Sequence, residues 1–324
     1  MNSMNSTFPR IISLLPSSTE IVAALGLKHH LVGRSHECDY PHAVKKLPVC
    51  TAPKFSPRGN SLDVHLRVQQ VLRDSLSVYE VFVDKLDQLK PDIIITQSQC
   101  DVCAVNLRDV KAALSHLVSS RPFVVDLQPN TLNDVMNDIL RVANATGFSE
   151  SGAQLVKSVR LRMRNVANMS RTVAEKKKVV CIEWIEPLMT AGNWVPRLVR
   201  MAGGESLFAK EGKHSTFIDW QDILDADPDV IILMPCGYKM HQTFDNLHFL
   251  INRPEWNLLR AVREQQVYLT DGNHFFNRPG PRLADSLEIL AEILHPEIFK
   301  PKYYGTGWIP LSEARTLTDM VLYQ

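Results

Sequence analysis

The sequence predicts an α/β protein built from two lobes. Short β-like runs alternate with helical stretches along the 324-residue chain, the pattern of parallel sheets covered by helices. A proline-free stretch rich in Arg, Lys, Val, Leu and Ala runs from Ser149 to about Lys178. As one helix it would reach about 40 Å, which suits a spine between lobes. A helix end, a Pro-Asp turn and a buried strand occur twice, at 89–94 and 226–231, and indicate two halves of similar design.

The N-terminal lobe is expected over residues 1–147. Its first strand, 10–15, is followed by a helix at 19–25, because Ser17 and Glu20 match a capping box and Gly26 is a typical stop. The remaining strands are expected at 31–35, 92–96 and 123–126. Helical patterns cover 62–75, 81–89, 106–117 and 132–146.

The spine is expected at 148–178 and the C-terminal lobe, with an extra tail, at 179–324. Two consecutive helices broken near Asn168 are the alternative reading of the spine. Strands are expected at 179–183, 230–233 and 266–270, each a short apolar run. Helices are expected at 195–201, 219–225, 240–251 and 282–294.

Composition excludes several classes of function. Charged residues make up 22% of the chain and the net charge is +1, which removes the electrostatic case for nucleic acid. No apolar run approaches the length of a membrane span, so no direct membrane insertion is expected. The first ten residues lack the basic start of a signal peptide, which predicts a cytoplasmic protein. A periplasmic or extracellular location is the alternative if a leader is missing. The 6 cysteines are too sparse for a disulfide scaffold.

The loops that follow the predicted strands concentrate cysteines, aromatic residues and carboxylates. Ligands of open α/β sheets bind at the carboxyl ends of the strands, so these loops predict the binding site. Aromatic side chains such as Trp184 and Trp194 would wall a large planar ligand, although either could equally belong to the core. The predicted ligand-binding residues are Ser17, Glu37, Cys38, Tyr40, Gln97, Cys100, Asp101, Glu183, Trp184, Glu186, Asn193, Trp194, Cys236, Tyr238, His274 and Phe275.

The order of motifs resembles a known family, the class III solute-binding proteins of ABC transporters, and most closely its vitamin B12-binding branch. The matching pieces are Arg10–Ile21, Leu25-Gly26-Leu27, Leu31–Ser35, Cys38–Pro41, the two Pro-Asp strands and Arg278–Arg282. The resemblance covers about residues 10–300. It implies two Rossmann-like lobes, a single connecting helix and a ligand cleft between the lobes. It also implies a corrinoid or related tetrapyrrole as the small-molecule ligand and, for an exported protein, a permease as partner.

Cys100 and Cys103 have the C-x-x-C spacing with which two thiolates chelate zinc. His36, Glu37, Cys38, Cys236 or His274 would complete such a site. A redox dithiol, a local disulfide and two plain turn residues are the alternatives. Zinc is therefore an open expectation, and no other cofactor is assigned.

An enzymatic role is the rival to binding. Cleft cysteines and carboxylates would serve thiol chemistry or metal-assisted hydrolysis, and a metal or cofactor chaperone is a third reading. The sequence favours binding without turnover and assigns no catalytic residue.

Overall fold

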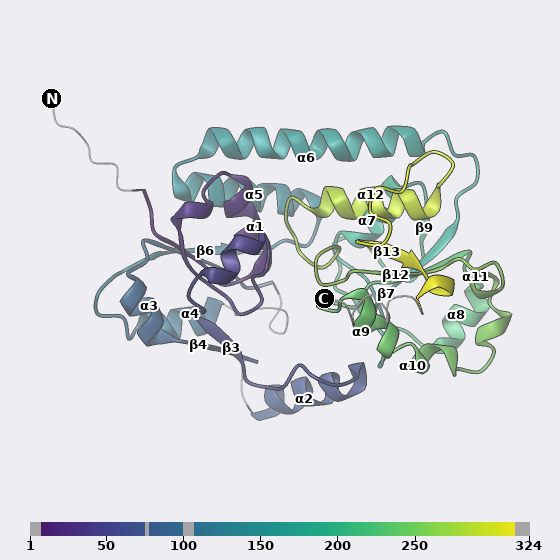
Figure 1. Ribbon diagram of the computed structural model, residues 1–324, viewed down its shortest axis with the longest axis horizontal. Helices are drawn as coiled ribbons and strands as arrows, with labels where there is room; N and C mark the ends of the chain where they lie inside the picture. Colours follow the sequence, from purple (N-terminus) through teal and green to yellow (C-terminus); the bar gives the residue numbers. More distant parts are fainter. Residues whose placement is uncertain (1–7, 75–77, 100–106, 315–324) are drawn as a thin grey trace. The chain divides into compact units, whose positions relative to one another are not determined.

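The computed structural model describes residues 8–74, 78–99 and 107–314. The chain divides into two compact units (Figure 1). Unit 1 comprises residues 1–57, 66–129 and 133–158, and unit 2 comprises residues 58–65, 130–132 and 159–324. Each unit has its own hydrophobic core.

Unit 1 is built on a parallel sheet with the strand order β2-β1-β5-β6. Its strands are β1 (Ile11–Ser13), β2 (Leu31–Arg34), β5 (Ile93–Gln97) and β6 (Phe123–Leu127). A separate antiparallel pair consists of β3 (Thr51–Pro53) and β4 (Tyr79–Val81). The helices of this part of the chain are α1 (Pro16–Ala24), α2 (Ser61–Asp74), α3 (Val83–Leu89), α4 (Leu107–Leu114), α5 (Leu132–Thr146) and α6 (Ser149–Ser170).

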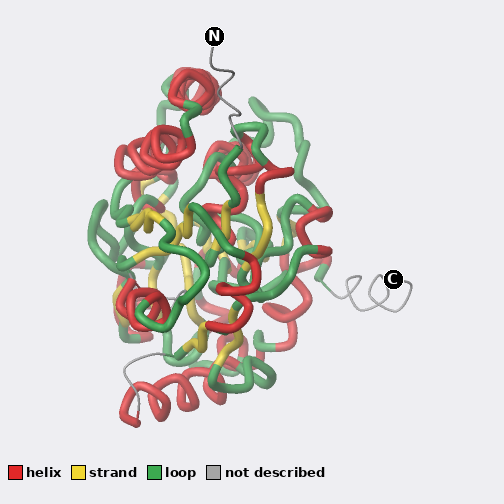
Figure 2. The backbone as a smooth tube through the Cα atoms, turned by 90° about the vertical axis from the view of Figure 1, so that its left-hand side faces the viewer, coloured by secondary structure: helices red, strands yellow, loops and turns green. Residues whose placement is uncertain are grey.

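Unit 2 is built on a larger mixed sheet with the order β10-β8-β7-β11-β12-β13, and β9 pairs with β7. The central strands β7 (Lys178–Trp184), β11 (Val230–Leu233) and β12 (Val267–Thr270) are parallel. Shorter strands complete it: β8 (Met189–Thr190), β9 (Glu205–Ser206), β10 (Thr216–Phe217) and β13 (Trp308–Pro310). The helices are α7 (Val195–Met201), α8 (Trp220–Ala226), α9 (Met240–Asp245), α10 (His248–Ile251), α11 (Arg260–Arg263) and α12 (Leu283–Leu294). Figure 2 distinguishes the helices, strands and loops of the backbone by colour.

The repeated Pro-Asp motif performs the same task in both units. Asp92 accepts a hydrogen bond from the backbone N–H of Arg10, just before β1, at 2.7 Å. Asp229 accepts one from the backbone N–H of Lys178, the first residue of β7, also at 2.7 Å. Each motif follows a helix that ends in a left-handed residue, Lys90 or Asp227. The motif therefore ends a helix and aligns two neighbouring strands, which confirms the similar design of the two halves.

Two sequence predictions about helix ends are corrected. The first helix begins at Pro16 rather than Thr19, and Leu15, which makes no side-chain cap, precedes it. The predicted capping box is wrong because proline is favoured at the first helical position. With Pro16 there, Ser17 is the second residue of the helix and not its N-cap. The predicted spine ends at Ser170, eight residues early, and is unbroken at Asn168. Helices α2 and α6 each run from one unit into the other, so a single linking helix is not confirmed.

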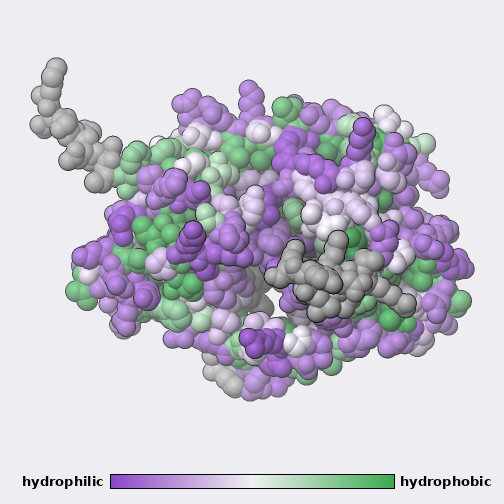
Figure 3. All heavy atoms as spheres, viewed as in Figure 1, coloured by the Kyte–Doolittle hydropathy of each residue, from purple (hydrophilic) through white to green (hydrophobic). Residues whose placement is uncertain are grey.

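Two further differences concern short elements. The helix expected at 240–251 is two helices, α9 and α10, which separate at Asn246 and Leu247. The strands β3, β4, β8, β9, β10 and β13 are three residues or fewer, too short to show a periodicity in sequence. No helix within the described residues is long and apolar enough to cross a membrane. Polar and apolar residues are interspersed on the face drawn in Figure 3.

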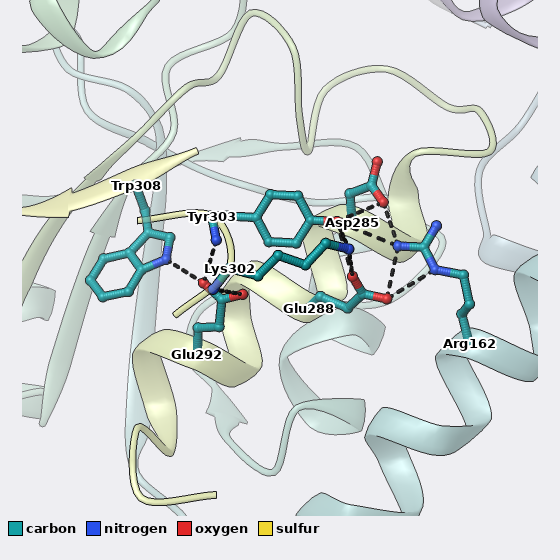
Figure 4. Close-up of polar contacts among 7 residues, drawn as sticks. All are labelled: Arg162, Asp285, Glu288, Glu292, Lys302, Tyr303 and Trp308. Atoms are coloured by element: carbon teal, nitrogen blue, oxygen red, sulfur yellow. Dashed lines mark hydrogen bonds and ion pairs between the residues drawn. The ribbon is translucent and has the colours of Figure 1, made fainter. Parts of the chain in front are cut away.

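A cluster of charged and aromatic side chains fastens the C-terminal segment of unit 2 (Figure 4). Arg162 of α6 donates to Asp285 and Glu288 of α12. The Tyr303 hydroxyl oxygen lies 2.9 Å from an oxygen of each of these carboxylates, so its single hydrogen is shared between them. Burial opposes the ionisation of Glu288, but hydrogen bonds from Arg162 and Lys302 outweigh it and hold its pKa below the ordinary value. This cluster joins α6, α12 and the segment that leads to β13.

Candidate functional site

The loops at the carboxyl ends of β7, β11 and β12 form one connected surface in unit 2. The N–H of Cys236 donates to the carbonyl of Glu183 at 3.1 Å, joining the first two loops. The N–H of Asn273 donates to the carbonyl of Tyr238 at 2.9 Å, joining the second and third. The structure thus brings together predicted residues from three separate stretches of sequence. We call this group the unit 2 site, defined by Glu183, Trp184, Glu186, Cys236, Tyr238, Asp271, His274 and Phe275.

An aromatic pair lies at the centre of the unit 2 site. The rings of Trp184 and Tyr238 have centroids 5.2 Å apart at an angle of 58°. Trp184 is half-buried, and its indole N–H donates to the carbonyl of Glu186 at 3.0 Å. Tyr238 is 7% exposed, yet its hydroxyl has no hydrogen-bond partner among the described residues. A buried hydroxyl without a partner is costly, so a group from outside the chain is a natural partner for it.

The carboxylates beside this pair are held by specific donors. Ser215 donates to Glu183 at 2.8 Å, and Arg253 donates to Glu186 at 2.6 Å. The Arg253 guanidinium also lies 5.6 Å from the centre of the Trp220 ring. Ser215 and Arg253 were not predicted, because neither follows a predicted strand.

Asp271 orients His274. One carboxylate oxygen of Asp271 accepts from the backbone N–H groups of Asn273 and His274. The other lies 2.7 Å from Nδ1 of His274. Asp271 directly follows β12, which is a signal that sequence analysis could have used.

Phe275 packs against Arg282, whose guanidinium lies 5.3 Å from the ring centre.

Trp194 and Asn193 take different places in unit 2. Trp194 is 4% exposed, and its indole donates to the carbonyl of Phe276 at 2.6 Å. Its ring therefore packs inside the unit. Asn193 adopts a left-handed conformation with φ of 50°, and its N–H donates to the carbonyl of Lys213.

The predicted residues of unit 1 also lie at the carboxyl ends of its parallel strands. Ser17 is 2% exposed, and its hydroxyl has no hydrogen-bond partner among the described residues. Cys38 is 1% exposed and accepts from Thr19 at 3.0 Å. Gln97 is buried at the end of β5, while Glu37 is half-buried near the Tyr79 hydroxyl and Tyr40 is exposed.

A polar cluster that the sequence did not predict lies beside β5 and β6. Ser98 donates to Asp126 at 2.6 Å, and Gln128 donates to both of them. Nearby, Arg141 donates to the backbone carbonyl of Asp126 and to the carboxylate of Asp138. Ser98 and Asp126 are 28 residues apart in the chain, and only the parallel pairing of β5 with β6 reveals their contact.

Asp138 should make the stability of unit 1 depend on pH. Burial raises the pKa of this carboxyl to about 7, although Arg141 opposes the shift. Because the pKa is higher when folded, the free energy of unfolding should fall as pH rises from about 4 to about 7. Asp138→Asn should remove about 1–2 kcal/mol of that fall, as measured by urea unfolding between pH 5 and pH 8. The exposed-site control Asp84→Asn should keep the wild-type dependence, and an unchanged profile in Asp138→Asn would contradict this assignment.

Cys100, Asp101 and Cys103 lie outside the described residues. Within residues 8–74, 78–99 and 107–314, no three His, Cys, Asp or Glu side chains are grouped to hold a metal ion. Cys50 and Cys181 are buried free thiols, and burial raises their pKa to about 11 and about 12. These two thiols are therefore poor nucleophiles near neutral pH.

Comparisons with known proteins agree with this architecture. Residues 11–273 match the family model described as periplasmic binding protein. An uncharacterised ABC transporter substrate-binding lipoprotein of Bacillus subtilis is 26% identical over 90% of this chain and 81% of its own. The vitamin B12-binding protein of Vibrio cholerae is 25% identical over 88% of each chain. The periplasmic heme-binding protein of Roseiflexus sp. RS-1 superposes with a TM-score of 0.67 at 20% identity, over 89% of this chain and 98% of its own. The last likeness shows the fold alone.

The cytoplasmic location expected from the sequence is corrected by these comparisons. The Bacillus subtilis relative is a lipoprotein, and the family is one of periplasmic binding proteins. These findings point to a periplasmic or extracellular location. The expectation failed because it relied on the composition of the first residues alone.

Proposed function

The chain belongs to the periplasmic binding protein family, and we propose that it binds a corrinoid of the vitamin B12 type for an ABC transporter. The main observation in support is the Trp184–Tyr238 pair, because the buried hydroxyl of Tyr238 has no hydrogen-bond partner among the described residues. A large planar ligand gains apolar contact from such rings and orientation from a polar group between them. The named vitamin B12-binding relative supports this choice of ligand.

The charges of the unit 2 site favour a corrinoid over haem. Glu183, Glu186 and Asp271 all belong to the unit 2 site, and Arg253 is already engaged with Glu186. A corrinoid carries carboxamides, which donate hydrogen bonds to carboxylates. The propionates of haem would meet like charge there, which costs binding energy.

Haem is the second candidate because of one specific contact. Metal-ligating histidines usually hold their other ring nitrogen against a carboxylate, and His274 is so held by Asp271. That arrangement suits the central metal of a macrocycle, iron or cobalt.

Membership of a family of binding proteins, together with the likeness to an ABC transporter substrate-binding lipoprotein, also implies a membrane permease as the protein's partner.

Calorimetric titration of the full chain tests the proposal. Cyanocobalamin should bind with 1:1 stoichiometry and a Kd of about 1 μM or tighter, and haemin at least about ten-fold more weakly. Tighter binding of haemin would shift the assignment to the second candidate. No heat of binding with either macrocycle would overturn both.

A further inference from the structure

Residues 58–65 leave unit 1 and pack with unit 2, although the chain on both sides of them belongs to unit 1. We call these eight residues the strap. They contain the first turn of α2, which continues in unit 1 from Leu66. A segment that packs with the other unit needs specific contacts to stabilise it there, because ordering each backbone residue costs about 1–2 kcal/mol of conformational entropy.

One buried hydrogen bond fastens the strap. The backbone N–H of Ser61 donates to the side-chain oxygen of Asn246, at the end of α9, at 2.7 Å. Ser61 is fully buried and Asn246 is 3% exposed. The amide of Asn246 donates in turn to the carbonyl of Gln242, which fixes its orientation. The strap is thus anchored to the helix that follows Tyr238.

Side chains of the strap meet the neighbourhood of the unit 2 site. The His65 ring stands edge-on to Phe217 of β10, with centroids 6.0 Å apart and an angle of 87°. Burial, and secondarily the charge of Asp63, raises the pKa of Tyr238 to about 12. Burial lowers the pKa of His65, and the charge of Glu186 opposes that shift. Asp63 and Tyr238, and likewise His65 and Glu186, are thus close enough to interact electrostatically.

We propose that the strap covers the Tyr238 end of the unit 2 site, that the Ser61–Asn246 hydrogen bond holds this cover in place, and that the strap contacts the bound ligand. The identity of the ligand rests on the proposed function, but the covering of Tyr238 does not. The cover explains why Tyr238 is 7% exposed although it lies in a loop. The strap also adds the Asp63 carboxylate and the His65 imidazole to the groups that determine which ligand binds.

Two variants release the strap by different means. Asn246→Ala removes the side-chain oxygen that accepts the hydrogen bond from the N–H of Ser61. Ser61→Pro removes the donating N–H, together with a buried hydroxyl that has no hydrogen-bond partner among the described residues. Ser61 is the first residue of α2, where proline is well tolerated. The matched control is Asn252→Ala, an exposed asparagine at the end of α10. Thermal unfolding of each variant shows whether the fold is retained.

The first measurement needs no ligand. Hydroxyl-radical footprinting of the full chain reports the solvent access of Tyr238. Oxidation of Tyr238 should rise severalfold in Asn246→Ala and Ser61→Pro and stay at the wild-type level in Asn252→Ala. Wild-type oxidation in both release variants would overturn the cover, whatever ligand the protein binds.

The second measurement uses cyanocobalamin in stopped flow. Loss of one buried hydrogen bond should raise the dissociation rate constant about five-fold in both release variants. Unchanged dissociation would overturn the contact between strap and ligand, while binding by the wild type would still support the proposed function. Failure of the wild type to bind cyanocobalamin would instead count against the proposed function, and the footprinting would decide the cover alone.

Discussion

Replacing Trp184 with alanine is expected to weaken cyanocobalamin binding by about 50-fold. The change removes the larger ring of the Trp184–Tyr238 pair, and aromatic anchors of this kind contribute about 2–3 kcal/mol to binding. The indole also donates to the carbonyl of Glu186, so the loop after β7 loses one constraint. Calorimetric titration measures the effect directly.

The control for Trp184→Ala is Phe123→Ala. Phe123 is 64% exposed and lies at the amino end of β6, away from the carboxyl ends of the strands. Its removal should leave the Kd for cyanocobalamin unchanged. Equal losses in the two variants would mean that Trp184 acts through general stability, and wild-type affinity in Trp184→Ala would remove the aromatic pair from the site.

Replacing Glu292 with glutamine is expected to lower the free energy of unfolding of unit 2 by about 2–4 kcal/mol. Glu292 is 3% exposed and accepts three hydrogen bonds, from the N–H groups of Lys302 and Tyr303 and from the indole of Trp308 (Figure 4). A glutamine amide offers one acceptor oxygen and places an NH₂ group against N–H donors. At least one buried donor then stays unpaired.

The loss should appear in urea unfolding followed by circular dichroism and tryptophan fluorescence. Because Trp308 begins β13, at the edge of the unit 2 sheet, the variant should also release that strand. The exposed Glu264→Gln should change the free energy of unfolding by less than about 0.5 kcal/mol. A similarly small change in Glu292→Gln would show that this carboxylate does not anchor the C-terminal segment.

The sequence was most informative where local physics decides the structure. Runs such as Ile93–Gln97 and Val230–Leu233 are continuously apolar and form buried parallel strands. The loops after these strands could be predicted to lie together because parallel strands end at one edge. The class III binding-protein fold was predicted on these grounds together with the resemblance, and the comparisons support it.

The sequence was least informative where partners are distant in the chain. Ser61 and Asn246 are 185 residues apart, and nothing in either neighbourhood indicates their contact. The short strands β8, β9 and β13 pair with the edges of the longer strands β7 and β12, and β10 pairs with β8, so their formation depends on neighbours distant in the chain. The clustering of Glu183, Tyr238 and Asp271 likewise depends on the order of strands in the sheet, which no local pattern specifies.

Native mass spectrometry of the full chain shows which macrocycle the protein prefers. The protein would be mixed with equimolar cyanocobalamin and haemin, and the intact complexes weighed. We expect one loaded species with a single corrinoid per chain, and loss of that species in Trp184→Ala. A spectrum in which haem is the bound macrocycle, or in which the chain stays unliganded, would contradict this expectation.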